Sequence, residues 1–146
     1  MEVRVQVEPF DFGVEAAAFA EGHTKMGAVV TFTGIVRDVA DGLDRMEIEH
    51  YPGMTEKALE AQAHAAVGRF KLGDVLVIHR HGTMRPGEMI MMVATAAPHR
   101  TDAFQGAEFL MDYLKSRAPF WKKEYTADGA EWVAAKDEDE DALSRW

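Results

Sequence analysis

A strong helical pattern runs from Thr55 to Phe70, and it limits the folds open to this chain more than any other feature. Its apolar residues recur every three or four positions and therefore share one face: Leu59, Ala63, Ala66, Val67 and Phe70. Because alanine side chains are short, a face rich in alanine packs closely against its neighbour. We expect this face to lie on a β-sheet, with Thr55 as the N-cap of the helix.

Segments with strand patterns precede and follow this helix. Alternation or β-branched residues predict strands over 3–7, 27–38, 46–51, 75–80 and 88–96. We expect the strand over 27–38 to be buried on both faces, since most of its residues are apolar or β-branched. The Asp41-Gly42 turn predicts a hairpin between 27–38 and 46–51, and Arg85-Pro86-Gly87 marks the turn before the last strand.

Helical patterns also occupy 14–20 and a stretch beginning near Thr101, where the second long helix delivers Lys115 in its last turn. Pro119 prevents that helix from continuing. Beyond it, Asp128-Gly129 predicts a hairpin with aromatic residues in both arms. Strands outnumber helices and are grouped in hairpins. The predicted fold class is therefore α+β, with a mixed, mainly antiparallel sheet, two main helices and a C-terminal hairpin.

Composition excludes several classes of protein. The 146 residues fit one domain, 1–146, which closes in an acidic tail over 137–146. Without cysteine, the chain has no disulfide or thiolate metal site, and we expect a cytoplasmic location. A formal net charge of −9 makes nucleic acid a poor partner. No stretch reaches the roughly 20 apolar residues that cross a bilayer, so we expect no membrane association.

Four cations gather between Met111 and Glu124 of this acidic chain: Lys115, Arg117, Lys122 and Lys123. Phe120 and Trp121 lie among them, and this pattern indicates a site for an anion. Lysine at a helix C-terminus also interacts favourably with the helix dipole, which explains Lys115 equally well without a site. Lys122 lies among aromatic residues and cations, which lower a lysine pKa and permit acid, base or nucleophilic chemistry near neutral pH.

Weaker signals lie elsewhere in the chain. Pro98-His99-Arg100 falls between a strand and a helix, where free backbone N–H groups and two cations can bind phosphate. A capping segment with solvated side chains explains it equally well, and Arg37 at a strand exit has the same two explanations. His79 and His81 are two residues apart on a strand, which is compatible with a metal site. No third ligand stands at motif spacing, so we expect no metal.

Several motifs follow one another along the chain: Phe32-Thr33-Gly34, Arg37, EHYPGMTEKAL from Glu49 to Leu59, Pro98-His99-Arg100, and DYLKSRAPFWKKE from Asp112 to Glu124. Together they resemble the large, catalytic subunits of molybdopterin synthase, the MoaE family. The resemblance covers about Gly27 to Trp132 and extends more weakly to Arg145-Trp146.

This resemblance implies an α/β-hammerhead-like fold and a sulfurtransferase of molybdenum cofactor biosynthesis. Such an enzyme converts cyclic pyranopterin monophosphate (precursor Z) to molybdopterin. The sulfur comes from the C-terminal Gly-Gly thiocarboxylate of a small ubiquitin-like carrier subunit. The resemblance also implies a homodimer of large subunits with one carrier at each end, a heterotetramer, and no cofactor. The alternative left open is a non-enzymatic binding module for an acidic peptide or a small anion.

By motif, the resemblance assigns catalysis to Lys115 and Lys122. Lys115 would activate the thiocarboxylate or transfer protons, and Lys122 would support the pocket. Pterin binding is assigned to three basic residues, of which the last two come from the neighbouring large subunit: Arg37, His99 and Arg100. Four further residues are expected to form walls of the pocket: Phe32, Met111, Pro119 and Phe120.

The acidic tail over 137–146 has two interpretations. Charge runs are usually solvated, which predicts a disordered end. Alternatively, the tail is an anionic chain that enters the cationic pocket and mimics the C-terminus of the carrier. Salt would weaken that second arrangement through screening.

Overall fold

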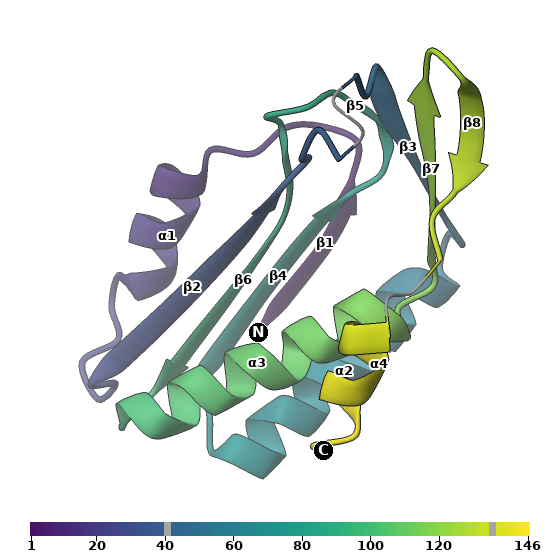
Figure 1. Ribbon diagram of the computed structural model, residues 1–146. Coiled ribbons are helices and arrows are strands. Elements are labelled where there is room, and N and C mark those ends of the chain that lie inside the picture. The colour runs from purple at the N-terminus through teal and green to yellow at the C-terminus, as the bar shows by residue number, and fades with distance from the viewer. Residues whose placement is uncertain (40–41, 135–136) are drawn as a thin grey trace.

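The computed structural model describes residues 1–39, 42–134 and 137–146. Its helices are α1 (Phe12–Ala20), α2 (Met54–Phe70), α3 (Arg100–Ser116) and α4 (Asp137–Leu143). Its strands are β1 (Glu2–Gln6), β2 (Ala28–Ile35), β3 (Arg45–His50), β4 (Asp74–Arg80), β5 (Gly82–Met84), β6 (Met89–Ala97), β7 (Phe120–Thr126) and β8 (Gly129–Trp132). Figure 1 shows a large sheet flanked by helices, with the β7–β8 hairpin projecting beyond it.

The first sheet has the strand order β1-β4-β6-β2. β1 pairs with β4 in parallel, and the other neighbours are antiparallel. Side chains alternate between its faces: Val75 and Val77 pack with α2 and α3, whereas Leu76 and Ile78 pack with Phe19 of α1. Helices therefore cover both faces, which explains why β4 is buried along nearly its whole length.

The second sheet has the order β5-β3-β7-β8, with antiparallel neighbours throughout. Successive residues of β7 face opposite sides. Phe120 packs against the core, while Trp121 is 44% exposed. The same alternation directs Lys122 inward and Lys123 outward. The β7–β8 hairpin around Asp128-Gly129 confirms the prediction, whereas the three-residue strand β5 had not been expected.

The prediction that 27–38 is buried on both faces is wrong. β2 is an edge strand of the first sheet, so among the described strands it has a neighbour on one side only. Val29, Phe32 and Ile35 consequently remain 39%, 42% and 54% exposed. The β-branched composition indicated a strand, but it carried no information on the position of that strand in the sheet.

The predicted hairpin between β2 and β3 is also wrong, because these strands lie in different sheets. The connection passes from one sheet to the other. In it, the Asp38 carboxylate accepts hydrogen bonds from the backbone N–H groups of Gly42 and Leu43, at 2.8 and 2.9 Å. Asp41, part of the expected turn, lies outside the described residues.

Helix α2 ends at Phe70 as predicted, but Thr55 is not its N-cap. The cap is Gly53, whose φ of 83° favours glycine, and its N–H donates to the Glu56 carboxylate at 2.6 Å. Thr55 is fully buried in the first turn. Its hydroxyl donates to the Pro119 carbonyl at 3.2 Å, so it ties the start of α2 to the end of the α3–β7 connection.

The C-terminal residues form a helix that packs on α3 (Figure 1). Trp146 lies edge-on against Phe70 and Phe109, and its indole N–H donates to Asp112 at 2.5 Å. The chain end therefore rests over α2 and α3.

The interpretation of the tail as a disordered end is wrong, because the tail is folded. Its terminal residue lies on this helix pair and does not enter the cationic pocket, whereas Asp139 of α4 lines a cavity together with Lys115 and Lys122. Within the described residues, no helix combines the length and apolarity that crossing a membrane requires.

Candidate active site

Lys115 and Lys122 come together because the chain reverses sharply after α3. The helix ends at Ser116, and the N–H groups of Arg117 and Ala118 both donate to the Tyr113 carbonyl. β7 then begins at Phe120, held by its pairing with β3. Only a short link therefore separates Lys115, in the last turn of α3, from Lys122 on the inner face of β7.

The two lysines form a wall shared by two cavities. The outer cavity has a volume of about 250 Å³. Besides the lysines, it is lined by Leu114, Ser116, Ala118, Phe120, Val133, Ala134 and Asp139. The inner cavity is smaller, about 70 Å³. Besides the lysines, it is lined by Phe32, Gly34, Ile35, His79, Ile90, Met91, Met111 and Leu114.

Two effects together lower the pKa of Lys122 to about 8: burial, which is the larger, and the nearby positive charge of Lys115. Asp139 of α4 acts in the opposite direction, because its carboxylate favours the ammonium form. A lysine with this pKa can exchange a proton near neutral pH. The sequence prediction of a proton-labile lysine at this position agrees with the structure.

The predicted walls are only partly where they were expected. Phe32 and Met111 line the inner cavity, and Phe120 lines the outer one. Pro119 is not among the described residues that line either cavity. Instead its carbonyl accepts a hydrogen bond from the Thr55 hydroxyl. Pro119 therefore affects the site indirectly, because this bond fixes the backbone between α3 and β7.

The three predicted pterin-binding residues are spread over the fold. Arg37 lies just beyond β2, whose Ile35 lines the inner cavity. His99 and Arg100 lie at the N-terminus of α3, at the opposite end of the helix from Lys115. Fifteen residues of helix span roughly 22 Å. Within one chain, His99 and Arg100 therefore do not reach the lysines.

From sequence, His79 and His81 were considered as metal ligands, as polar residues at a strand end or as interface contacts, and no metal was expected. The two rings instead have different neighbours: His79 stacks on Phe120 with a centroid distance of 3.8 Å, and His81 lies 4.0 Å from His50. Among the described residues, no group of three or more potential ligands is arranged to hold a metal ion. His79 lies inside the lysine site, and the signal available in the sequence was a histidine in line with Val75 and Val77 on a buried strand face.

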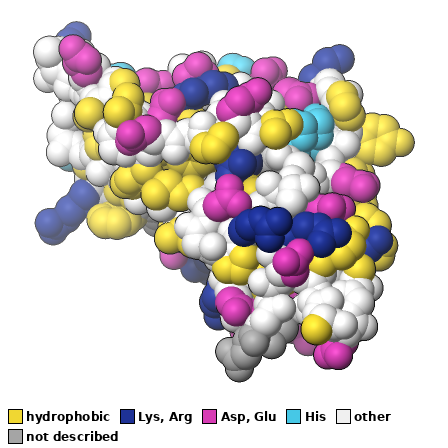
Figure 2. Space-filling view, turned by 90° about the horizontal axis from the view of Figure 1, so that it is seen from above, with side chains coloured by type: hydrophobic (Ala, Val, Ile, Leu, Met, Phe, Trp, Pro, Cys, Tyr) yellow, Lys and Arg dark blue, Asp and Glu magenta, His cyan; other side chains and the backbone are white. Residues whose placement is uncertain are grey.

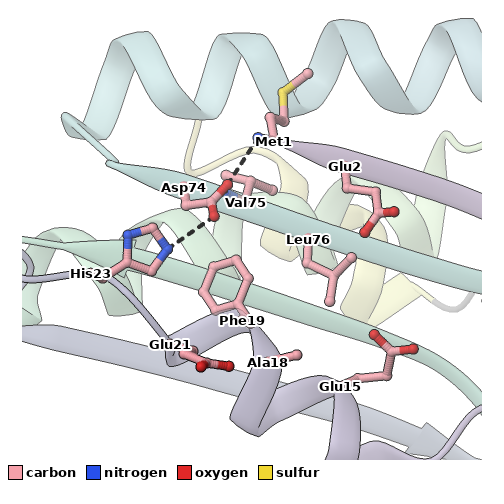
Figure 3. Close-up of a pocket in the computed structure, with 10 residues that line it drawn as sticks. All are labelled: Met1, Glu2, Glu15, Ala18, Phe19, Glu21, His23, Asp74, Val75 and Leu76. Atoms are coloured by element: carbon pink, nitrogen blue, oxygen red, sulfur yellow. Dashed lines mark hydrogen bonds and ion pairs between the residues drawn. The ribbon is translucent and has the colours of Figure 1, made fainter.

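A further hollow lies on the other side of the first sheet, next to α1. Asp74 lines it, and Figure 3 shows this carboxylate bound both to the N-terminal ammonium group of Met1 and to His23, at 2.9 and 3.0 Å. Glu2, Glu15 and Glu21 also line this hollow. Its acidic character makes it unsuitable for an anionic substrate.

The molecular surface has mixed charge on the face seen in Figure 2, where Lys and Arg side chains alternate with Asp and Glu. No broad basic area marks that face. The cations that share a cavity wall, Lys115 and Lys122, instead form a local site for a small anionic group or a carboxylate-like chain end.

Comparison with known proteins places this geometry in a family. A sequence model described as MoaE protein matches residues 5–117, which is more than half of the chain. The chain belongs to the MoaE protein family. A relative from Cereibacter sphaeroides named molybdopterin synthase catalytic subunit is 66% identical over 146 residues, and the match covers 100% of both chains.

Solved MoaE structures share the fold. The molybdopterin biosynthesis MoaE protein from Burkholderia ambifaria superposes with a TM-score of 0.84 at 51% identity, and the match covers 99% of this chain and 96% of that one. Molybdopterin synthase from Staphylococcus aureus gives a TM-score of 0.81 at 29% identity, covering 90% and 96%. The resemblance stated from sequence motifs and the α+β fold class are both confirmed for this MoaE protein.

Proposed function

We propose that this chain is the catalytic subunit of a molybdopterin synthase. It acts as a sulfurtransferase that converts precursor Z to molybdopterin with sulfur from the thiocarboxylated C-terminus of a small carrier subunit. The carrying observation is the lysine pair shared by two cavities, with the pKa of Lys122 lowered to about 8. The name of the 66% identical relative supports the same reaction.

The lysines divide the chemistry between them. Attack of the thiocarboxylate sulfur on a pterin side-chain carbon breaks a carbon–oxygen bond of the cyclic phosphate and leaves negative charge on the phosphate oxygen. Addition of water to the resulting thioester then develops negative charge on the acyl oxygen, and collapse of that adduct breaks the acyl–sulfur bond and releases the carrier as a carboxylate. Lys115 stabilises this charge as a fixed cation. Lys122 donates or accepts the proton that the reaction transfers, because its lowered pKa leaves both protonation states of the amine accessible near neutral pH. The resemblance had given Lys115 either activation of the thiocarboxylate or proton transfer, and the electrostatics favour Lys122 for the proton transfer.

The outer cavity suits the end of a carrier chain. Its wall includes Phe120 and Val133, which offer apolar contact, and the lysines stand where a terminal thiocarboxylate needs a cation. A Gly-Gly end carries no side chains and so fits a narrow entry. Asp139 faces the same space, which gives the tail helix α4 a place beside the proposed entry.

The pterin site is proposed to be completed by a second copy of the chain, within a heterotetramer of two large and two carrier subunits. The roughly 22 Å along α3 from Arg100 to Lys115 supports this, because one chain alone cannot bring both residues to one substrate. The exposed edge strand β2 carries Phe32, which also lines the inner cavity. The inner cavity thus lies next to a surface open to another subunit.

A reconstitution assay tests the function. Purified chain is mixed with precursor Z and thiocarboxylated carrier, and molybdopterin is measured. Formation of molybdopterin identifies the enzyme, whereas binding of carrier or pterin without turnover identifies the binding module instead. Carrier ending in an ordinary carboxylate is the matched control, since it binds the same cations but has no sulfur to give.

Mixed dimers test the shared site separately. Lys115→Ala and Arg100→Ala subunits, each strongly impaired alone, should recover activity on mixing, because one site of each mixed dimer retains both residues. A site contained in one chain predicts no recovery. The cytoplasmic location expected from the lack of cysteine remains a prediction.

A further inference from the structure

His79 occupies a position in the lysine site to which no role has been given. On β4, Val75, Val77 and His79 share the face covered by α2 and α3, because strand residues two apart point the same way. The His79 side chain is buried, with 2% of the residue exposed, and it lines the inner cavity together with Lys115 and Lys122. A polar ring at this depth needs a hydrogen-bonding function.

Two contacts fix the orientation of this ring. Nδ1 lies 2.8 Å from the Arg80 carbonyl oxygen, and because that oxygen can only accept, Nδ1 carries the proton and donates it. The Phe120 ring stacks on the imidazole at 3.8 Å with an interplanar angle of 16°. In the neutral ring, Nε2 is therefore an acceptor with a lone pair in a defined plane.

The neighbours of His79 include the proton-labile lysine. Phe120 and Lys122 are two apart on β7 and share its inner face, so the ring that stacks on Phe120 lies beside Lys122. Burial first, and then the charge of Lys122, lower the pKa of His79 to about 3. The imidazole thus stays neutral at physiological pH and adds no third positive charge.

The charged groups facing Lys122 come from two other elements: Lys115 of α3 repels it, and Asp139 of α4 attracts it. Asp139 lines the outer cavity only. Among the described side chains that line the inner cavity, the strong acceptor is His79 Nε2, since the others are apolar, thioether or lysine. An ammonium group directed toward the inner cavity meets this lone pair.

We propose that His79 is a positioning residue for Lys122: when the ammonium group turns toward the inner cavity that both side chains line, it donates a hydrogen bond to Nε2, a contact that the structure itself does not contain. The relevance of this contact to turnover rests on the proposed function. The contact itself is inferred from the shared inner cavity and from the charge of Lys122 acting on His79.

A matched pair of variants distinguishes the loss of the Nε2 hydrogen-bond acceptor from the loss of packing around the His79 ring. In His79→Asn, the amide nitrogen occupies the position of Nδ1 and still donates to the Arg80 carbonyl, but nothing reaches the position of Nε2. In His79→Gln, the longer side chain places an acceptor near Nε2 and loses the Nδ1 donor. A purely structural role for His79 predicts equal damage from both, in proportion to the loss of melting temperature.

In the reconstitution assay, His79→Asn should lower kcat about tenfold or more with KM for precursor Z unchanged, because it disturbs a proton-transfer group. His79→Gln should recover most of that loss. The proposal is overturned if His79→Asn turns over at the wild-type rate, or if both variants lose activity equally.

A second readout needs no turnover. Acetic anhydride modifies only neutral amines, so the pH dependence of Lys122 acetylation, followed by mass spectrometry, reports its pKa in the free protein. Exposed Lys57 serves as the internal reference. Loss of the acceptor destabilises the ammonium form, so His79→Asn should move the Lys122 midpoint to lower pH, and His79→Gln should not. An unmoved midpoint in His79→Asn overturns the proposal.

Wild-type protein provides a test that does not depend on the folding of variants. The ¹⁵N NMR shift of His79 Nε2 at pH 7 distinguishes a hydrogen-bonded acceptor from a free lone pair, and the free value overturns the proposal. If the wild type forms no molybdopterin but the Lys122 midpoint still moves in His79→Asn, then the proposed function fails while the His79 contact stands.

Discussion

The two faces of β7 place adjacent lysines in opposite environments. On the inner face, Lys122 lies between two cavities beside Lys115, and its pKa is lowered to about 8. On the outer face, Lys123 lies over the rings of Tyr125 and Trp132, at 5.5 and 5.1 Å from their centroids. A shift of one residue along the strand changes the environment of the same side chain completely.

This difference separates chemistry from surface stabilisation. The outer face is built from pairings between half-buried groups: the Arg45 guanidinium lies 3.8 Å from the Tyr125 ring, and the Tyr125 hydroxyl donates to Glu47 at 3.0 Å. Glu47 is thus engaged in surface contacts. On the inner face, burial and a like charge make Lys122 costly to keep protonated. This unfavourable burial of an ammonium group occurs at the site where we propose proton transfer.

The largest expected effect comes from removing one lysine of this pair. Lys122→Ala should reduce sulfur transfer by about a hundredfold or more, since it removes the proton-exchanging group. Lys123→Ala, its matched control on the outer face, should retain near-normal turnover. The rate of molybdopterin formation measures both, and a similar loss in the two variants would contradict the assignment of the inner face.

Lys115→Ala should have the next largest effect, a loss of about tenfold to a hundredfold, because a fixed cation is missing from the transition state. The fold should remain intact, with the free energy of unfolding changed by about 1 kcal/mol or less, as expected for a residue at a helix end. Chemical denaturation checks the second part.

The same variant also predicts a pH shift with a defined sign. Lys115 lowers the pKa of Lys122, so its removal should raise that pKa. The limb of the pH–rate profile that belongs to Lys122, near pH 8 in the wild type, should therefore move to higher pH. Movement to lower pH, or none, would show that the two lysines are not coupled.

Replacing the buried charge should stabilise the protein while it removes activity. Lys122→Met keeps the length and apolar stem of the side chain, and it should raise the free energy of unfolding at pH 7 by about 1 kcal/mol. Lys123→Met should bring no such gain. Melting temperatures of the two variants at matched pH measure the difference, and a loss of stability in Lys122→Met would argue against a costly buried charge.

Linkage gives this comparison a pH window. Lys122 has a folded pKa of about 8, below the ordinary value of 10.5 expected in the unfolded chain. Between these values the unfolded state binds more protons, so the contribution of Lys122 to stability rises with pH across this window. The difference between wild type and Lys122→Met should therefore shrink as pH increases from about 8 to 10.5.

The smallest expected effect concerns the tail. Asp139→Asn removes a carboxylate that lines the outer cavity, and it should tighten carrier binding a few-fold at low salt, with the gain shrinking at high salt. Glu138→Gln, an exposed neighbour on α4, is the control. Equal affinities at low salt would show that α4 does not compete with the carrier. This replaces a deletion of 137–146, which would also remove the packing of Trp146 on Phe70 and Phe109.

Local patterns in the sequence determined the secondary elements closely. The periodicity over 55–70 predicted α2, and Asp128-Gly129 predicted the β7–β8 hairpin. These signals depend on residues near one another in the chain, where turn chemistry and helical spacing act directly. The cation cluster around the end of α3 was visible for the same reason, since Pro119 separates the helix and the strand that carry it.

Partnerships between distant segments were decided only by the tertiary structure. β2 pairs with β6 instead of β3, and Thr55 serves the α3–β7 connection instead of capping α2. The resemblance to known motifs had supplied the roles of Lys115 and Lys122, but it did not reveal His79, which reaches them from another strand. Strand partners and pKa values depend on burial and charge summed over segments far apart in sequence. The sequence therefore determines by itself which elements form. The packing of those elements decides which side chains share a site, and whether Lys122 or its neighbour Lys123 is able to lose a proton.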